Sequence, residues 1–141
     1  MKLNTTIFFA HTWRKIFLTV LSIVCNSLPL FSQEFLSSIE KAFKHGNAKS
    51  LEVYFDNHID VAFSEKTTSY PRKQAEMLIQ KFFTKVEPKD FTKVNKGTSH
   101  ANNTIYYIGT MTTSAGLYQV YMFFVIKNAT YVMKELRFEK G

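Results

Sequence analysis

Three polar side chains near the middle of the chain alternate in a way that could bind a metal ion. Asp56, His58 and Asp60 stand at every second position, so they would share one face of an extended backbone. Two carboxylates and one imidazole can hold a divalent cation. Ile59 and its alternate neighbours are apolar, however, which predicts that the trio is the solvated face of a strand. Because three exposed polar groups make a poor site, we expect no metal ion.

The other titratable side chains form no pattern that is typical of an enzyme. His45 stands beside Gly46 at the expected end of a helix, where an imidazolium would complement the helix carbonyls, and His100 lies in a polar turn. Glu135 and Arg137 share one face of the last expected strand. We favour an ion pair there, with a buried pair that shapes a pocket as the alternative. We expect no catalytic residue and no cofactor.

Aromatic side chains offer a different chemistry, the binding of a ligand by shape. The chain has 14 Phe and 7 Tyr, and residues 117–126 are apolar on both faces of the expected strand. The sheet therefore has more apolar surface than one layer of helices can cover. Either an apolar pocket stays open inside the sheet, or its outer face pairs with another copy. Tyr107, Gln119 and Tyr121 are the polar side chains that we expect to face inward and orient a ligand.

Two helices and a pair of strands are predicted ahead of these residues. Apolar positions recur at spacings of three and four over residues 33–45, which predicts a helix. Gly46 can end that helix, and Asn47 can cap a second one over residues 48–55. Residues 59–63 alternate as a half-buried strand does, and a turn then leads to a short strand near residues 68–70.

A third helix is predicted over residues 70–86. Pro71 suits the first turn of a helix, because its missing N–H would have no partner there, and Pro88 stops the helix. The apolar positions line one side of it: Ala75, Leu78, Ile79, Phe82 and Val86. A side so apolar is expected to close a core and to carry no reaction.

After Pro88 the apolar pattern alternates. Four strands are predicted over residues 91–97, 104–113, 117–127 and 131–138, and short turns at residues 114–116 and 127–129 join the last three. Helices followed by an antiparallel meander predict a single α+β domain.

The first 32 residues have the pattern of a secretory signal peptide. A basic region precedes an apolar run of about ten residues, which is shorter than the roughly 20 that a membrane-spanning helix needs. We predict cleavage between Ser32 and Gln33, which leaves residues 33–141 as the domain. Lipidation at Cys25 and a retained N-terminal anchor are the alternatives.

Charge and cysteine content narrow the class of protein. Residues 1–32 hold three of the 18 basic residues and none of the 11 acidic ones, which leaves a balance of +4 for the rest of the chain. That balance is too mild to indicate nucleic-acid binding. The single cysteine lies in the leader, so the domain is expected to fold without a disulfide. We expect a periplasmic or secreted protein with no membrane span after cleavage.

Four stretches resemble one known family: GNAKSLEVYFDNHIDV (46–61), YPRKQAEMLIQKFF (70–83), YYIGTMTTSAGLYQVYMFF (106–124) and KELRFEK (134–140). The chain resembles the exported bacterial proteins of the domain of unknown function 4783 family, in the nuclear transport factor 2-like superfamily. The resemblance implies a cystatin-type cone, in which a curved, mostly antiparallel sheet wraps around about three helices.

We therefore expect an exported binding or protein-interaction module with an apolar, aromatic cup and no enzymatic activity. Its partner would be a small apolar ligand or a protein, with a homodimer through the outer sheet face as one form. The alternative is a small cone-fold isomerase, dehydratase or hydrolase with an acid or base in the cup. The polarity of the cup separates these two classes.

Overall fold

The computed structural model describes residues 30–99 and 103–141. The chain divides into two compact units, residues 1–36 and 37–141, and all strands belong to the second. The elements are α2 (Leu30–Lys44), α3 (Ala48–Glu52), β1 (Phe55–Phe63), β2 (Lys66–Pro71), α4 (Arg72–Val86), β3 (Pro88–Ser99), β4 (Thr104–Thr113), β5 (Gly116–Lys127) and β6 (Thr130–Lys140).

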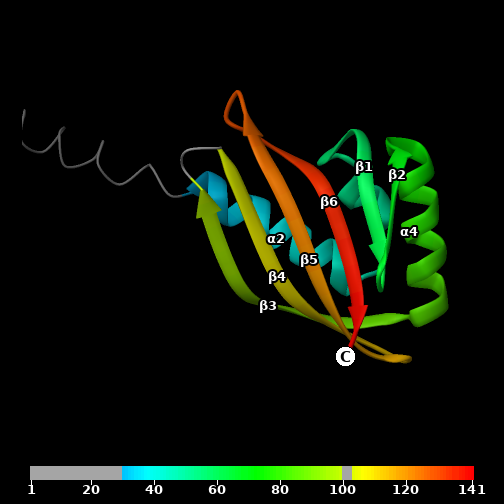
Figure 1. The fold of residues 1–141 in the computed structure, drawn as a ribbon. Helices are drawn as coiled ribbons and strands as arrows, with labels where there is room; N and C mark the ends of the chain where they lie inside the picture. Colours follow the sequence, from blue (N-terminus) through cyan, green and yellow to red (C-terminus); the bar gives the residue numbers. More distant parts are fainter. Residues whose placement is uncertain (1–29, 100–102) are drawn as a thin grey trace, which may run out of the picture. The chain divides into compact units, whose positions relative to one another are not determined.

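The six strands form one curved sheet in the order β2-β1-β6-β5-β4-β3 (Figure 1). The pair of β1 and β6 is parallel, and every other pair of neighbours is antiparallel. The predicted α+β architecture, a curved and mostly antiparallel sheet with helices, is therefore confirmed.

One face of the sheet, the covered face, packs against helices. In Figure 1 the part of α2 from residue 37 onward lies behind the sheet, and α4 lies beside β2. Phe43 of α2 stacks on Phe91 of β3 with ring centroids 4.7 Å apart, and it also meets Phe138 of β6 at 6.3 Å. Phe83 of α4 contacts the same Phe138 ring at 6.1 Å. Burying each of these rings stabilises the domain by about 1.5–3 kcal/mol.

The buried side of α4 differs from the predicted one at Leu78, Phe82 and Phe83. Leu78 and Phe82 are half-buried, whereas Phe83, which lies one turn after Ile79, is buried. The buried positions of the helix are Ala75, Ile79, Phe83 and Val86. Phe82 lies at the border of the core, where its ring meets Phe63 of β1 at 4.8 Å. The helix closes the core as expected, and both phenylalanines contribute to it.

The helix ends follow local sequence. Gly46 has φ +60° after α2, which is the left-handed conformation that glycine adopts readily, and the Asn47 side chain accepts a hydrogen bond of 3.1 Å from the Ser50 N–H. Pro71 is the residue before α4, with ψ 146°, so it precedes the first turn instead of entering it. Phe55 begins β1 instead of ending the second helix, because it pairs with β6 in the parallel ladder.

The four strands predicted after α4 are confirmed with small extensions, whereas β1 begins four residues before its predicted start. β4 has the predicted bounds, and β3, β5 and β6 each extend by one to three residues beyond theirs. The β5–β6 turn places Asn128 and Ala129 at φ +49° and +60°, the positive values that a two-residue hairpin turn of type I′ requires.

The predicted leader falls almost entirely outside the described residues. α2 begins at Leu30, three residues before Gln33, so the predicted cleavage point lies in its first turn. In the described ranges no helix is both long enough and apolar enough to cross a membrane.

Candidate binding surface

The side chains predicted to orient a ligand lie on opposite faces of the sheet. Tyr107 of β4 belongs to the covered face and is 1% exposed. Gln119 is exposed and Tyr121 half-buried on the opposite face, which we call the open face. Successive residues of a strand point to opposite faces, and the register pairs Tyr107 with Met122 but Tyr121 with Ile108. Tyr107 faces the core as predicted, whereas the prediction that Gln119 and Tyr121 also face inward is wrong. The role of the three in ligand binding stays a prediction.

Tyr107 is part of the core. Its ring packs edge-on against Phe124 with centroids 5.9 Å apart, and the Lys96 ammonium lies 5.9 Å from its ring centroid. Burial raises the pKa of the Tyr107 hydroxyl to about 12, with a smaller contribution from Tyr131. Because the hydroxyl stays protonated near neutral pH, it is poorly suited to general acid–base chemistry there.

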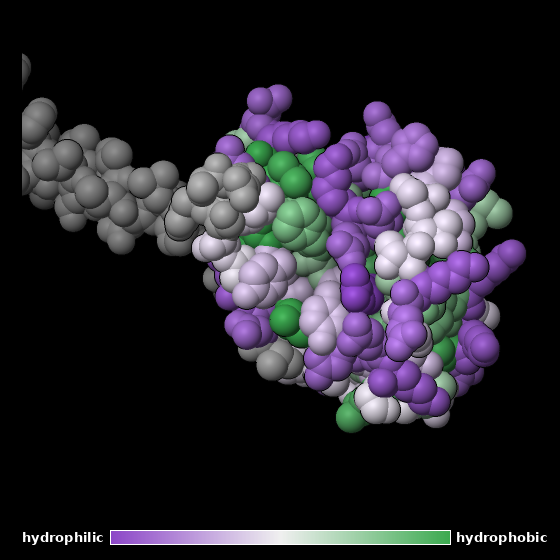
Figure 2. Space-filling model, in the orientation of Figure 1, coloured by the Kyte–Doolittle hydropathy of each residue, from purple (hydrophilic) through white to green (hydrophobic). Residues whose placement is uncertain are grey.

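The open face has a hollow of about 360 Å³ over β4, β5 and β6. Two rows of cross-strand partners line it, the first being Tyr106, Phe123 and Glu135 and the second Ile108, Tyr121 and Arg137. Glu139 extends the polar side along β6. Figure 2 views this face, with apolar and weakly polar residues over β4 and β5 beside a hydrophilic stripe over β6.

Large aromatic side chains stay exposed in this hollow. Tyr106 is 46% exposed and Phe123 is 37% exposed. The Tyr106 ring lies across Gly97 of β3, where a Cβ atom would overlap the ring. The missing side chain lets the ring lie close to the backbone of the neighbouring strand, which holds the aromatic surface in place.

Ion pairs define the polar side of the hollow. An Arg137 guanidinium nitrogen, Nη2, lies 2.9 Å from a carboxylate oxygen of Glu135, while Nη1 lies 3.7 Å from Glu139. The predicted ion pair of Glu135 with Arg137 is therefore confirmed, and it lies on the open face. The hydrogen bond from Glu135 raises the pKa of Arg137 further above its usual value. The guanidinium is a fixed positive charge between two carboxylates.

Of the three alternating polar residues of β1, Asp56 forms an ion pair, and His58 and Asp60 are exposed to solvent. Asp56 pairs with Lys134 of β6, and this hydrogen bond, followed by one from the Asn57 N–H, lowers the pKa of the Asp56 carboxyl. His58 and Asp60 are exposed, as predicted. Among the described residues no three potential metal ligands lie close together. The expectation that the protein binds no metal ion stays a prediction.

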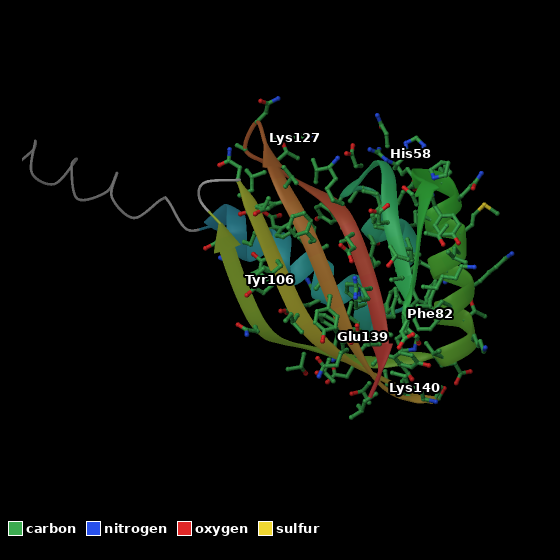
Figure 3. The ribbon with its side chains drawn as sticks, in the orientation of Figure 1. His58, Phe82, Tyr106, Lys127, Glu139 and Lys140 are labelled. Carbon is green, nitrogen blue, oxygen red and sulfur yellow. The ribbon has the colours of Figure 1, made fainter. Side chains whose placement is uncertain are left out.

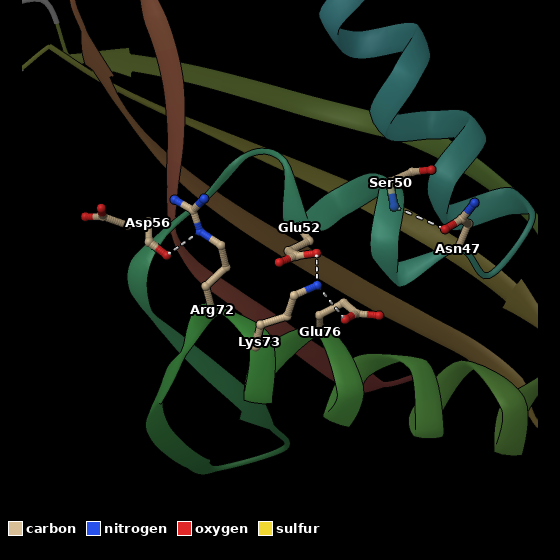
Figure 4. A network of polar contacts seen from close by, with 7 residues as sticks. All are labelled: Asn47, Ser50, Glu52, Asp56, Arg72, Lys73 and Glu76. Carbon is tan, nitrogen blue, oxygen red and sulfur yellow. Dashed lines mark hydrogen bonds and ion pairs between the residues drawn. The ribbon is translucent and has the colours of Figure 1, made fainter.

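A polar network near Asp56 has a structural role (Figure 4). The Arg72 Nε donates to the Asp56 carbonyl oxygen at 3.4 Å. The Lys73 ammonium lies 2.9 Å from Glu52 of α3 and 3.6 Å from Glu76 of its own helix. These contacts join the start of α4 to α3 and β1.

The imidazole of His45 lies at the end of α2, as predicted. Its Nδ1 is 2.8 Å from the carbonyl oxygen of Lys41. His100 lies outside the described residues.

The sequence interpretation missed Ile108, Phe123 and Glu139 as members of this surface. Strict alternation from Tyr121 would have placed Phe123 on the same face, and alternation from Arg137 would have placed Glu139 there. Alternation along β4 from Tyr106 would likewise have placed Ile108 there.

The curved, mostly antiparallel sheet with helices on one face defines a fold of the nuclear transport factor 2-like, cystatin-type class. The family model DUF4783, described as a domain of unknown function, matches residues 36–139. The chain belongs to the DUF4783 family.

Solved structures agree with this assignment. A DUF4783 family protein from Bacteroides ovatus is 25% identical, with a TM-score of 0.70, over 74% of this chain and 93% of that chain. A DUF4783 family protein from Bacteroides uniformis is 26% identical, with a TM-score of 0.69, over 74% and 95%. A Nostoc punctiforme domain of unknown function with a cystatin-like fold is 14% identical, with a TM-score of 0.60 over 77% and 74%, and shows the fold alone. No curated protein matches the chain.

Proposed function

We propose that this protein is a non-enzymatic binding module that works outside the cytoplasm and holds an apolar or aromatic group of its partner on the open face of its sheet. The observation that carries the proposal is the hollow of about 360 Å³ with Tyr106 and Phe123 exposed in it. An apolar patch rimmed by polar residues is typical of interaction sites.

The covered face is a poor alternative for binding, because side chains fill it. Phe43, Phe83 and Phe138 meet there and are each at most 2% exposed. A ligand on that face would have to displace rings that contact one another. This arrangement moves the proposed site from the cup expected from the sequence to the outside of the sheet.

The chemistry of the hollow favours binding over catalysis. Arg137, which lines the hollow, has its pKa raised further above its usual value, and the Tyr107 hydroxyl, with a pKa of about 12, lies on the covered face of the sheet. The Glu135 carboxylate already pairs with Arg137 at 2.9 Å. A general acid or base works best with a pKa near the working pH. A carboxylate that is already paired with a guanidinium is better suited to orienting a bound partner than to transferring a proton. The cone-fold enzyme remains the alternative.

Native mass spectrometry of the protein purified from its natural host tests the proposal. We expect the wild type to retain a bound molecule or subunit and the Phe123→Ser variant to lose it, because the substitution removes the exposed ring from the hollow. Val53→Ser is the matched control, since Val53 is 71% exposed after α3 and outside the hollow. A wild type that retains nothing, or a Phe123→Ser variant that retains as much, would contradict the proposal.

A further inference from the structure

We infer that the partner of the open face is a segment of another protein that presents an arginine side chain beside an apolar or aromatic one. The inference rests on the function proposed above, because it names the chemistry of the partner at the same surface. Three features of the open face support it: its net charge, the position of its carboxylates next to exposed rings, and its place on the outside of the sheet.

The open face is acidic, although the protein as a whole is basic. Glu135, Arg137 and Glu139 lie along β6 in the hollow. Asp60 adds a carboxylate on β1, because it is exposed, has buried neighbours on both sides in the strand and pairs with Glu135 in the parallel ladder. These three carboxylates and one guanidinium have a net charge of −2, whereas residues 33–141 together carry +4. The face therefore attracts a cationic partner and repels an anionic one.

The other charges that the structure describes near this group offset it little. Asp56 and Lys134 form an ion pair with each other. Lys127 lies at the β5–β6 hairpin, whereas Glu139 lies toward the opposite end of β6 (Figure 3). Lys127 is four residues from Phe123 on the same strand, which is roughly 13 Å. Exposed charges at that distance are largely screened at physiological salt, where the Debye length is about 8 Å.

Exposed aromatic rings lie next to the carboxylates. Phe123 of β5 is the cross-strand partner of Glu135 on one side and of Tyr106 on the other. Side chains directly opposite each other in a sheet have Cβ atoms about 5 Å apart. Phe123 is 37% exposed and Tyr106 is 46% exposed, and an aromatic ring attracts a cation that lies within about 6 Å of its centroid. A cation beside Phe123 would therefore be attracted by the ring and by the carboxylate together.

Arginine fits this arrangement better than lysine does. Its planar guanidinium stacks on aromatic rings and donates two parallel hydrogen bonds to one carboxylate. Glu139 has room for such a bond, because its contact with Arg137 is 3.7 Å, against 2.9 Å for Glu135. Asp60 makes no ion pair with any side chain that the structure describes. Since an ionised carboxylate has about four acceptor sites, both can accept from a second guanidinium.

The position of the hollow favours a protein segment over a small molecule. A pocket for a small molecule usually covers about 70–90% of the surface of its ligand. This hollow of about 360 Å³ lies on the outside of a sheet, and its central rings are exposed. A side chain bound there would be covered by the sheet on one side and by the rest of its own protein on the other.

Three peptides of equal length test the charge of the partner. Each has two tyrosines around a central residue, glycine at both ends and blocked termini, and the central residue is arginine, citrulline or glutamate. Citrulline keeps the shape of arginine without its charge. In NMR titrations at low salt, the arginine peptide should bind the wild type about fivefold or more tightly than the citrulline peptide, and the glutamate peptide should bind most weakly. The preference should disappear in about 1 M salt, where the Debye length is about 3 Å.

Variants of the open face show which side chains recognise the charge. The double variant Asp60→Asn with Glu139→Gln should bind the arginine and citrulline peptides equally, because it keeps the rings and loses two carboxylates. Glu40→Gln is the matched control and should keep the preference, since Glu40 lies on α2, outside the hollow. Phe123→Ser should weaken the binding of all three peptides, as the proposed function requires.

The outcomes separate this inference from the proposed function. Arginine and citrulline peptides that bind the wild type equally, and that Phe123→Ser weakens equally, would overturn the arginine and keep the binding module. A wild type that binds none of the peptides would also overturn this inference, while native mass spectrometry tests the binding module independently. Peptide binding that Phe123→Ser leaves unchanged would contradict both. Circular dichroism and thermal unfolding of each variant show whether lost binding reflects a lost fold.

Discussion

At the scale of the residue, the Tyr107 hydroxyl links the stability of the fold to pH. Its pKa in the folded protein is about 12, against an ordinary value of 10.0, because burial disfavours the phenolate. The folded state therefore holds this proton more tightly than the unfolded state does. The contribution to stability is complete below pH 10 and is lost as the pH rises from 10 through 12.

Urea unfolding of the wild type and Tyr107→Phe at pH 8, 10 and 12 checks this prediction. Between pH 10 and 12 the wild type should lose about 2 kcal/mol more unfolding free energy than the variant, which has no phenol at this position. Equal losses in the two proteins would show that the hydroxyl ionises as easily in the folded state as in the unfolded chain.

At the scale of the element, α4 closes the core through the side chains of one buried side. Ile79 is fully buried, whereas Met77, two residues earlier on the same helix, is 58% exposed. Ile79→Asp would place an unpaired carboxylate in the core and should cost roughly 3–5 kcal/mol, which is comparable with the whole stability of a marginally stable domain. Met77→Asp should change the stability by less than about 1 kcal/mol.

Thermal unfolding followed by circular dichroism compares these two variants. The pair is matched, because both place the same carboxylate on the same helix and differ in burial. If Ile79→Asp unfolded at the wild-type temperature, α4 would not pack on the sheet as described.

At the scale of the whole molecule, the predicted cleavage of the leader would change where α2 begins. Export with cleavage between Ser32 and Gln33 would remove the first three residues of α2, which starts at Leu30. Ile39 and Phe43, which are at most 1% exposed, would stay in the core. We therefore expect the processed domain to remain folded.

Intact mass spectrometry of the protein from the periplasm or medium of its natural host checks the processing. The expected N-terminus is at or close to Gln33. An unprocessed chain recovered from the cytosol would contradict export, and a lipid modification on Cys25 would establish the alternative leader.

Much of the fold could be predicted because its signals are local. Gly46 adopts the left-handed conformation that ends α2, Asn47 caps α3, and alternation alone located β4. The errors lie where distant partners compete with local preference. Phe55 continues a helical pattern in the sequence, yet it joins β1 because β6 offers it a backbone ladder.

The site was harder to predict than the fold, because a strand pattern shows alternation without showing which set of side chains faces the helices. By itself, the sequence determined the α+β class, the order of the elements and the ion pair of Glu135 with Arg137, all of which depend on near neighbours in the chain. Only the tertiary structure decided that Tyr107 is in the core while Tyr121, Phe123 and Glu139 share the open face. That division depends on the pairing of β4, β5 and β6 and on which face Phe43 and Phe83 cover, and both join residues far apart in the sequence.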